Sequence, residues 1–497
     1  MNLPILSIVV FLPLAGALLL ALVPKEADKS IRAITLVITT ATFLASIVVV
    51  ALFNAADSGF QLIERHQWVP SAGANYTLGV DGISLWLVLL TTLLFPISVL
   101  ASQRVGHRVK AFHVVLLVLE TGILGVFVAL DLLLFYVFWE GMLIPMYFLI
   151  GMWGYGRRVY AAVKFFLYTL AGSLLMLAGI VALYFIGGRT FDLTELFRAN
   201  IAFNPQMWLF AAFFVSFAIK VPIFPLHTWL PDAHTEAPTA GSVVLAGVLL
   251  KMGAYGFLRF SIPLFPDASR RFAPWLALLG VIGIVYGGVV SIVQKDLKRL
   301  IAYSSVSHMG FVVLGIAALT ASATSGSVLQ MVSHGLVTGL LFLLVGMLYE
   351  RAHTREIADL KGINRMMPVF GGVFLFASLA SLGLPGLSGF VGEFLILNGT
   401  FDVYRGLAIA GTTGVVLAAV YLLWAYERVF TGPAKVPESQ RRSVWRDMSV
   451  REIVVVAPLI ALILFIGLYP KPFLTRIEPS VVRMLDIAGG VAEVAAR

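Results

Sequence analysis

The sequence contains no cysteine and few charged residues. Only 12% of its 497 residues are Asp, Glu, Lys or Arg, whereas 60% are hydrophobic. Without cysteine there can be no disulfide, no thiolate metal site and no cysteine-ligated iron–sulfur cluster, so electron-transfer chemistry would rest on the eight histidines or on an organic cofactor. A soluble domain with so few charges could not cover its surface, but lipid accepts apolar side chains. The composition therefore predicts a membrane protein.

The chain is net basic, with a formal charge of +9. The basic residues fall between hydrophobic runs and form no continuous patch, so they indicate membrane topology and not a nucleic-acid surface. The first apolar run, residues 3–23, lacks the basic stretch that precedes the core of a cleavable signal peptide.

Apolar runs recur along the whole chain at the length of membrane helices, which need about 20 residues each. We expect an all-α polytopic membrane protein with about fourteen transmembrane helices and no separate soluble domain. The predicted segments are 2–23, 30–53, 78–101, 111–130, 131–152, 160–186, 206–230, 238–261, 272–294, 300–321, 328–349, 369–397, 406–430 and 452–470.

Most lysines and arginines of the loops follow odd-numbered segments. The positive-inside rule therefore predicts that these loops are cytoplasmic and that both termini lie on the opposite side. For a bacterial protein this membrane is the inner, or plasma, membrane.

Two predicted segments are interrupted in matching ways. The seventh carries Lys220 beside Pro222 and Pro225, and the twelfth carries Pro385 among four glycines before Glu393. Interrupted helices at corresponding positions indicate inverted repeats around an ion path. We therefore expect two inverted five-helix repeats, each with a broken helix. The predicted parts are helices 1–3 (1–110), the first repeat (111–261), the second repeat (272–430), and a cytoplasmic loop with helix 14 and the C-terminal tail (431–497).

A glutamate and a lysine are expected at similar membrane depth. Glu140 lies about 14 Å along its helix from Asp131 at a rise of 1.5 Å per residue, and Lys220 is similarly deep in its segment. Burial disfavours both charges while their attraction favours them, so a third charge can tip the protonation of such a pair. The alternative is a static ion pair that fixes helix packing, although buried pairs stabilise poorly.

Lys251 stands deep in the next segment with no acid at comparable depth there. An unpaired buried lysine releases its proton readily, which suits a relay. The alternative is a side chain that snorkels to the interface.

Two histidines lie in neighbouring apolar segments with hydroxyls one turn away. Ser304 precedes His308, and Thr338 follows His334. Histidine exchanges protons near neutrality. The alternatives are hydrogen-bonded core histidines or axial ligands of a membrane haem.

Glu393 follows the second break, where it is predicted either to carry a proton or to cap freed backbone N–H groups. Glu120, Asp131 and Lys164 lie nearer segment ends or between segments, where water could reach them.

Several stretches resemble one family. FYVFWEGMLIPMYFLIGMWG, APTAGSVVLAGVLLK, IAYSSVSHMGF and GFVGEF are similar to the antiporter-like membrane subunits of respiratory complex I, the proton-pumping NADH-quinone oxidoreductase. The resemblance runs through roughly residues 75–430. Two features make the sequence most similar to the chain M group and distinguish it from chains L and N. They are Lys251 in its motif and a glutamate, not a lysine, at position 393.

The resemblance implies proton-transfer roles for six residues. Glu140 and Lys220 would be the acid and base of the pump, Lys251 the central relay, His308 and His334 the connecting groups, and Glu393 the terminal site. It also implies that this chain holds no cofactor and no metal. NAD, FMN, iron–sulfur clusters and quinone would lie in partner subunits, and chains L and N would be neighbours in the membrane.

The sequence therefore predicts a translocase subunit that couples quinone reduction elsewhere to proton pumping. One alternative is a subunit of a multi-subunit cation/proton antiporter of the same ancestry. Another is a membrane anchor of a hydrogenase or cytochrome complex in which the buried charges are only structural.

Overall fold

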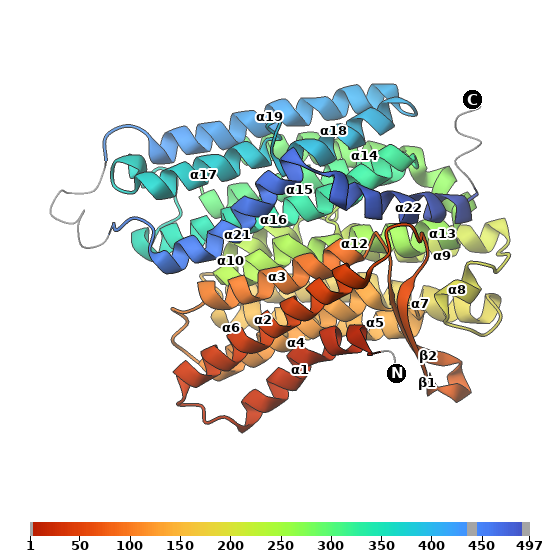
Figure 1. Ribbon diagram of the computed structural model, residues 1–497. Helices are drawn as coiled ribbons and strands as arrows, with labels where there is room; N and C mark the ends of the chain where they lie inside the picture. Colours follow the sequence, from red (N-terminus) through yellow and green to blue (C-terminus); the bar gives the residue numbers. More distant parts are fainter. Residues whose placement is uncertain (1–2, 435–444, 490–497) are drawn as a thin grey trace.

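The computed structural model describes residues 3–434 and 445–489, which form a bundle of helices lying side by side (Figure 1). The larger helices are α1 (Ile5–Leu22), α2 (Asp28–Leu52), α3 (Leu85–Ala101), α4 (Val109–Val128), α5 (Leu132–Gly141), α6 (Leu143–Trp153), α7 (Arg158–Ile186), α9 (Phe203–Lys220), α10 (Trp229–Glu236), α14 (Pro266–Ile292), α15 (Leu297–Ala317), α16 (Ala321–Ala352), α17 (Pro368–Ser381), α18 (Ser388–Phe401), α19 (Arg405–Phe430), α21 (Val450–Leu468) and α22 (Lys471–Ile487).

One span combines α-helical and π-helical turns. In chain order it contains α11 (Thr239–Val244), the π-helical η2 (Leu245–Leu249), α12 (Leu250–Gly256), the π-helical η3 (Phe257–Ser261) and α13 (Ile262–Leu264). The remaining short elements are α8 (Leu193–Leu196) and the 3₁₀ turns η1 (Pro70–Ala72) and η4 (Ile363–Arg365).

The apolar segments are helical, which confirms the predicted fold class. Eleven helical segments of the described part are long and apolar enough to cross a membrane. Three of the fourteen predicted spans do not meet that criterion: 78–101 contains the 17-residue α3, and 206–230 and 369–397 are each divided into two helices. The count of fourteen and the division into repeats remain predictions.

Both predicted interruptions are present. In the seventh segment α9 ends at Lys220, and the chain becomes helical again only at Trp229. In the twelfth, six residues separate α17 from α18, and two of them, Gly383 and Gly386, adopt positive φ angles of +80° and +93°. Glycine adopts such angles without steric cost, so the glycines permit the sharp change of direction. The sequence did not indicate a third, smaller break at Met142, between α5 and α6.

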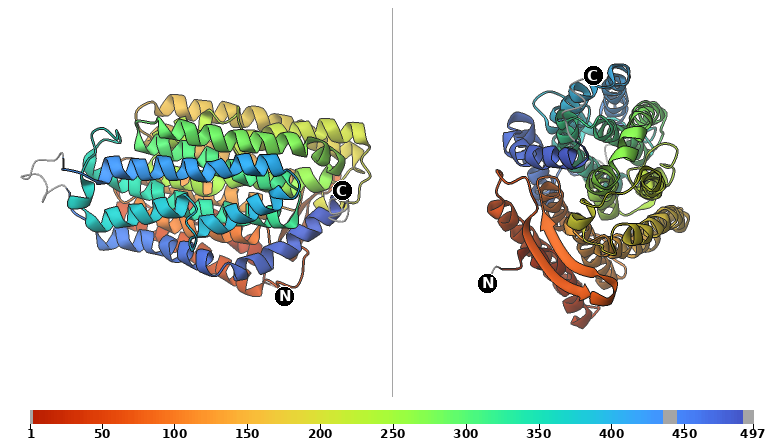
Figure 2. Two further views of the ribbon diagram at one scale, coloured as in Figure 1. Left: turned by 90° about the horizontal axis from the view of Figure 1, so that it is seen from above. Right: turned by 90° about the vertical axis from the view of Figure 1, so that its right-hand side faces the viewer.

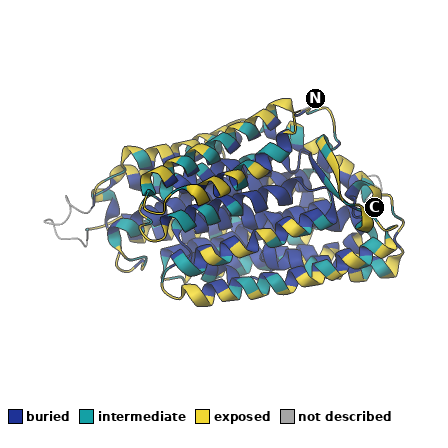
Figure 3. Ribbon diagram, turned by 90° about the horizontal axis from the view of Figure 1, so that it is seen from below, coloured by how far each residue is buried: buried dark blue, intermediate teal, exposed yellow. Residues whose placement is uncertain are grey.

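The core of the bundle is formed by three spans. The 18-residue apolar window of the span 239–264 is completely buried, and the corresponding windows of α15 and α16 are 94% buried. In the outer helices α2, α7 and α21, only 28%, 39% and 33% of the corresponding windows are buried. Exposed positions, drawn in yellow, lie along the outer helices of the bundle (Figure 3). Lipid solvates exposed apolar side chains, so a surface of apolar side chains around the buried spans is the arrangement that a bilayer requires.

A β-hairpin lies across one end of the bundle (Figure 2). Strand β1 (Gln61–Val69) pairs antiparallel with β2 (Ala74–Val80), and the carboxylate of Glu64 accepts hydrogen bonds from the backbone N–H groups of Leu6 and Ser7. We call this end, where α1 begins and α22 ends, the hairpin end, and the opposite end the loop end (Figure 1). Residues 54–77 fall between two predicted spans, and neither the hairpin nor α22 was predicted from the sequence.

The common end of α1 and α22 agrees with the predicted arrangement of the termini, although the side of the membrane stays a prediction. The boundaries of the predicted parts are likewise untested. Within the last part, 431–497, residues 435–444 and 490–497 lie outside the described residues.

A buried ion pair attaches α21 to the loop end of α16. Arg351 Nη1 and Nη2 donate to Glu452 Oε1 and Oε2 at 2.7 and 2.8 Å, and Arg351 Nε donates to the carbonyl of Arg446 at 2.9 Å. The Glu452 side chain also accepts from the backbone N–H of Ser449, which caps α21.

We predict that Arg351→Met lowers the free energy of unfolding by about 3 kcal/mol, because it leaves the Glu452 carboxylate buried without its partner. In the double variant Arg351→Met/Glu452→Leu the free energy of unfolding should fall by less, since no uncompensated charge remains buried. Thermal unfolding of the purified protein in detergent measures both. Equal losses in the two variants would show that the charge is not the cause.

Candidate functional site

Lys220 is almost completely enclosed by apolar and aromatic groups at the end of α9. Its side chain is 1% exposed, and its Nζ lies 3.6 Å from the sulfur of Met142. The rings of Trp139 and Phe165 each have their centres 5.4 Å from Nζ. Aromatic faces and a thioether stabilise a cation only weakly compared with a carboxylate, so the ammonium is poorly compensated.

The predicted direct contact between Glu140 and Lys220 is not formed. These two side chains have no ion pair within 4.0 Å, and Glu140 Oε1 has no hydrogen-bond partner. The Glu140 carboxyl lies beside Ser173 and Tyr136. The positive charge of Lys220 attracts this carboxyl from a distance, without a direct contact. Met142, at the break after α5, occupies the position next to Nζ that a carboxylate would take. The pair is therefore held apart.

Lys164 connects this region to the broken seventh segment. Its Nζ donates to Asp232 Oδ2 at 2.7 Å and to the carbonyl of Thr228 at 2.9 Å. Thr228 and Asp232 flank the start of α10, so Lys164 holds the second half of the broken helix in place.

Two acids that sequence analysis placed within reach of water are buried. Glu120 is fully enclosed in α4, and neither of its oxygens has a hydrogen-bond partner. Asp131 caps α5 by accepting from the N–H groups of Leu133 and Leu134, and it also accepts from Asn75 of the hairpin. Burial raises the pKa of the Asp131 carboxyl, and these three hydrogen bonds oppose the rise.

Lys251 lies between two π-helical segments and contacts a histidine. Its side chain is 0% exposed, and Nζ lies 2.7 Å from His334 Nδ1. Nζ also donates to the carbonyl of Ala246 in η2, five residues earlier. Wider π turns often occur at functional sites. Lys251 is thus buried without an acid, as predicted, but it has the His334 partner that sequence analysis did not assign to it.

His308 and Glu393 form a second contact. His308 Nδ1 lies 3.0 Å from Glu393 Oε1, and His308 Nε2 lies 3.2 Å from both Ser381 Oγ and Tyr421 Oη. Gln330 donates from Nε2 to the same Glu393 oxygen at 3.0 Å. Glu393 therefore accepts side-chain hydrogen bonds and caps no freed backbone N–H group.

The two contacts meet at a small cavity. The rings of His308 and His334 have centroids 5.9 Å apart, and both line a cavity of about 10 Å³ together with Gln330, Ser333 and Ser381. That volume accommodates about one water molecule. His334 Nε2 is buried and has no hydrogen-bond partner. One water would link the histidines into a row from Lys251 to Glu393.

The predicted hydroxyl neighbours have other roles. Ser304 Oγ donates to the carbonyl of Ile301, and Thr338 lines the small cavity without contacting His334 through a hydrogen bond. The haem alternative does not fit, because both ring nitrogens of His308 have protein partners and the space between the histidines is far smaller than a haem.

Sequence analysis missed two further groups between the loop end and Lys251. His234 in α10 is fully buried, with its ring stacked on Phe342 at 4.7 Å, and neither ring nitrogen has a hydrogen-bond partner. Lys298 is also buried, and its Nζ donates to the carbonyl of Ala237 at 2.5 Å. The sequence signal for His234 was its place between two predicted spans, 206–230 and 238–261, just after the broken segment.

Glu236 lies beside these groups, outside the predicted spans. Burial raises the pKa of its carboxyl, while the positive charges of Arg355 and Lys298 lower it. An acid in this position can accept a proton at the loop end. Gln330 and Tyr421, which hold Glu393 and His308, were also missed because neither is charged.

Within the described ranges, 3–434 and 445–489, no group of three or more His, Asp or Glu side chains is placed to hold a metal ion. Each of Lys251, His334, His308 and Glu393 is a side chain that can hold or release a proton.

Family models and individual relatives indicate the same protein family. The family described as "NADH:quinone oxidoreductase/Mrp antiporter, TM" matches residues 129–418, and "NADH-ubiquinone oxidoreductase chain 4, amino terminus" matches residues 29–125. NADH-quinone oxidoreductase subunit M of Rhodobacter capsulatus is 48% identical over 499 residues, which cover 97% of this chain and 96% of the relative.

Solved structures share the fold. A chain of respiratory complex I from Thermus thermophilus superposes with a TM-score of 0.89 at 33% identity, and the match covers 98% of this chain and 100% of that one. A chain of the Mrp complex from a Dietzia species has a TM-score of 0.87 at 18% identity, covering 100% of this chain and 99% of the other. The second likeness shows the fold alone.

We predict that Gly383→Ala destabilises the protein by about 1–3 kcal/mol, because alanine disfavours the φ of +80°. The added methyl carbon would also lie 2.8 Å from Glu393 Oε2 and push that side chain from His308. Gly372→Ala is the control, since the added methyl meets no atom within 4 Å and alanine favours the helix by about 1 kcal/mol. Thermal unfolding in detergent separates them, and equal shifts would contradict the assigned role of Gly383.

Proposed function

Because this chain belongs to the NADH:quinone oxidoreductase/Mrp antiporter family of membrane subunits, we propose that it translocates protons as subunit M of an NADH:quinone oxidoreductase. The observation that carries the proposal is the buried row of Lys251, His334, His308 and Glu393, joined by contacts of 2.7 and 3.0 Å around a one-water cavity.

Each group in the row can receive a proton from one side and release it to the other. The Lys251 ammonium gives a proton to His334 Nδ1, and the imidazolium then releases the proton from Nε2 into the cavity. A water there passes it to His308, which delivers it to Glu393 through the Nδ1 contact. Histidine suits this task because it titrates near neutral pH.

Uptake starts at the loop end. Glu236 collects protons there, and Lys298 and His234 lie between it and Lys251. Glu393 is the exit group, because α18 runs from it to the hairpin end. On the predicted topology the loop end is cytoplasmic and the membrane is the bacterial inner membrane.

Glu140 and Lys220 act as the switch and not as a link in the row. Their separation leaves the Lys220 charge poorly compensated, so a change in the neighbouring subunit that moves the carboxylate changes the proton affinity of Lys220. The altered charge of Lys220 then favours or opposes a proton on Lys251.

The redox steps belong to partner subunits. NAD, FMN, iron–sulfur clusters and quinone are bound there, and the antiporter-like chains L and N are the proposed membrane neighbours. This chain supplies a proton path and switchable charges, and it contributes to the oxidoreductase as a coupling subunit.

A cation/proton antiporter subunit is the second candidate, because the fold also matches an Mrp chain. The 48% identity to subunit M over nearly the whole chain, against 18% to the Mrp chain, favours the oxidoreductase. Sodium-dependent proton transport by vesicles without NADH would favour the antiporter. The membrane-anchor alternative requires that the buried charges be dispensable for pumping.

We predict that Lys220→Ala in the assembled complex lowers coupled NADH oxidation and proton pumping by about tenfold or more, since a proton-exchanging group is removed. Lys220→Arg should also be impaired, though less, because arginine keeps the charge but does not release its proton. Both rates are measured on the same membrane vesicles, with complex content determined by immunoblot.

Lys295→Ala is the matched control, since Lys295 is exposed at the loop end. It should leave both rates unchanged. Normal pumping and oxidation in Lys220→Ala would refute the proposed switch.

A further inference from the structure

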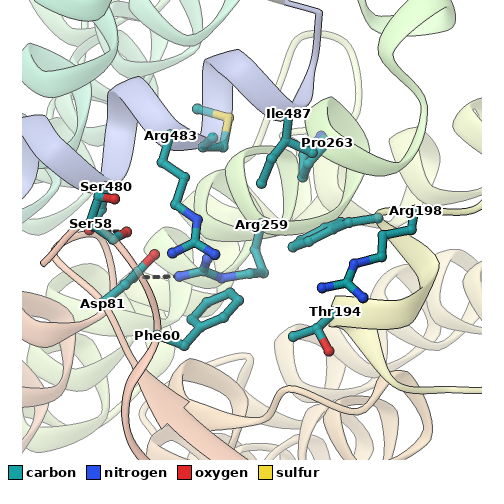
Figure 4. A pocket seen from close by; sticks show the side chains of 12 residues that line it. Ser58, Phe60, Asp81, Thr194, Arg198, Arg259, Pro263, Ser480, Arg483 and Ile487 are labelled. Carbon is teal, nitrogen blue, oxygen red and sulfur yellow. Dashed lines mark hydrogen bonds and ion pairs between the residues drawn. The ribbon is translucent and has the colours of Figure 1, made fainter.

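A pocket at the hairpin end takes no part in the proton path. Its volume is about 290 Å³, and it lies where four parts of the chain meet: the hairpin region, α8, the end of the span 239–264, and α22 (Figure 4). The polar side chains that define it include Asp81, Arg198, Arg259, Ser480 and Arg483.

Three guanidinium groups point towards the middle of the pocket (Figure 4). Arg259 is 4% exposed and is held from both sides, because Nη2 donates to Asp81 Oδ1 at 2.5 Å and Nε donates to Tyr255 Oη at 3.0 Å. Arg198 and Arg483 have no acidic partner within 4.0 Å in the described part of the chain. Three arginines and one aspartate leave the lining with a net charge of +2.

Arg198 and Arg483 reach the pocket from opposite sides. Arg198 follows α8, and Arg483 comes from α22 and crosses to the hairpin region, where its Nη1 and the Asp57 Oδ1 are the atoms nearest to the place that a Cβ on Gly59 would take. A side chain at residue 59 would displace this guanidinium. Ser480 is neutral, and its Oγ accepts a hydrogen bond from the backbone N–H of Gly82 at 2.9 Å, which attaches α22 to the segment after the hairpin.

The rest of the lining is apolar. Phe60, Phe197, Met484 and Ile487 face the same space. Helix α22 is amphipathic, with buried Phe473, Ile477 and Val481 on one side and charged residues on the other, as is typical of helices that lie at a membrane surface. The pocket thus combines an anion-binding part with an apolar part at the end of the bundle.

We propose that this pocket binds an anionic phospholipid, with its phosphate between Arg198, Arg259 and Arg483 and its apolar part along Phe197 and Ile487. Arginine binds phosphate oxygens through paired, charge-assisted hydrogen bonds, and the apolar side chains beside the three arginines suit the acyl part of the same molecule. The inference is independent of the proposed proton path, since none of these residues belongs to it.

The test compares the intact complex with its Arg198→Gln/Arg483→Gln variant, which leaves the buried Arg259–Asp81 pair in place. Arg271→Gln is the matched control, because Arg271 is exposed near the same end and does not line the pocket. The delipidated complexes are titrated with phosphatidylglycerol or phosphatidylcholine in detergent, and bound lipid is counted by native mass spectrometry. NADH oxidation reports assembly.

We expect phosphatidylglycerol to bind the wild type and Arg271→Gln equally, and the double variant at least about tenfold more weakly. Phosphatidylcholine, which has no net charge, should bind weakly to all three. The single variant Arg483→Gln should show an intermediate loss, and it replaces the double variant if that one does not assemble.

Inorganic phosphate added as a competitor distinguishes the source of the phosphate. If free phosphate at equal concentration fails to displace the lipid, the result supports the phospholipid as the ligand. If it does displace the lipid, the proposal is overturned and the ligand is a soluble anion. Equal phosphatidylglycerol binding by wild type and variants would refute the site. Loss of neighbouring subunits without a change in lipid binding would assign the arginines to a subunit interface and also refute it.

Discussion

Keeping ionisable side chains away from lipid is the constraint on which this structure depends. A charge in the membrane interior costs several kcal/mol unless protein groups replace its hydration. Lys251, His308 and His334 accordingly lie on the three most buried spans, where no lipid reaches them. Glu140, Lys220 and Glu393 lie on the surrounding helices α5, α9 and α18, which also present apolar side chains on their outer faces. The arrangement of helices in the bundle follows from the need to shield and solvate these few groups.

The compensation of these charges by neighbouring groups is uneven along the molecule. His308 and Glu393 satisfy one another with help from Gln330 and Tyr421. Lys220 has only aromatic rings and a thioether, while Glu140 keeps an oxygen without a partner. A well-solvated group holds its protonation state, whereas a poorly solvated one responds to small changes in nearby charge. On the proposed function, the poorly compensated pair is therefore suited to control, and the satisfied cluster to conduction.

Much of this could be predicted from the sequence because single-residue properties determine it. Apolar runs of membrane length indicated the helices. Pro222, Pro225 and Pro385 marked the breaks because each is accompanied by a charged residue or by glycines, whereas single prolines such as Pro13 and Pro96 lie inside continuous helices. All six candidate residues were identifiable as ionisable groups within apolar runs. The hairpin was not predicted, because residues 54–77 mix polar and apolar side chains without regular alternation, and α22 was too polar to resemble a span.

Partner choice could not be predicted, because it depends on helix rotation and on neighbours far away in the chain. Equal depth suggested that Glu140 meets Lys220, but depth does not specify which face of each helix carries the side chain, and Met142 intervenes. The contact between Lys251 and His334 joins residues 83 positions apart, and it occurs next to π turns that a 3.6-residue period does not anticipate. Neutral groups such as Gln330 carried no signal at all.

Helix α16 carries Gln330 and His334 one turn apart, so one uninterrupted 32-residue rod serves both the Glu393 and the Lys251 contacts. One residue inserted or deleted in α16 before Gln330 would rotate Gln330 and His334 by about 100° relative to the preceding part of the helix. Both side chains would then point away from their partners. Evolution can therefore substitute residues along α16 but can hardly change its length, and insertions and deletions among relatives should be confined to the connections at its two ends.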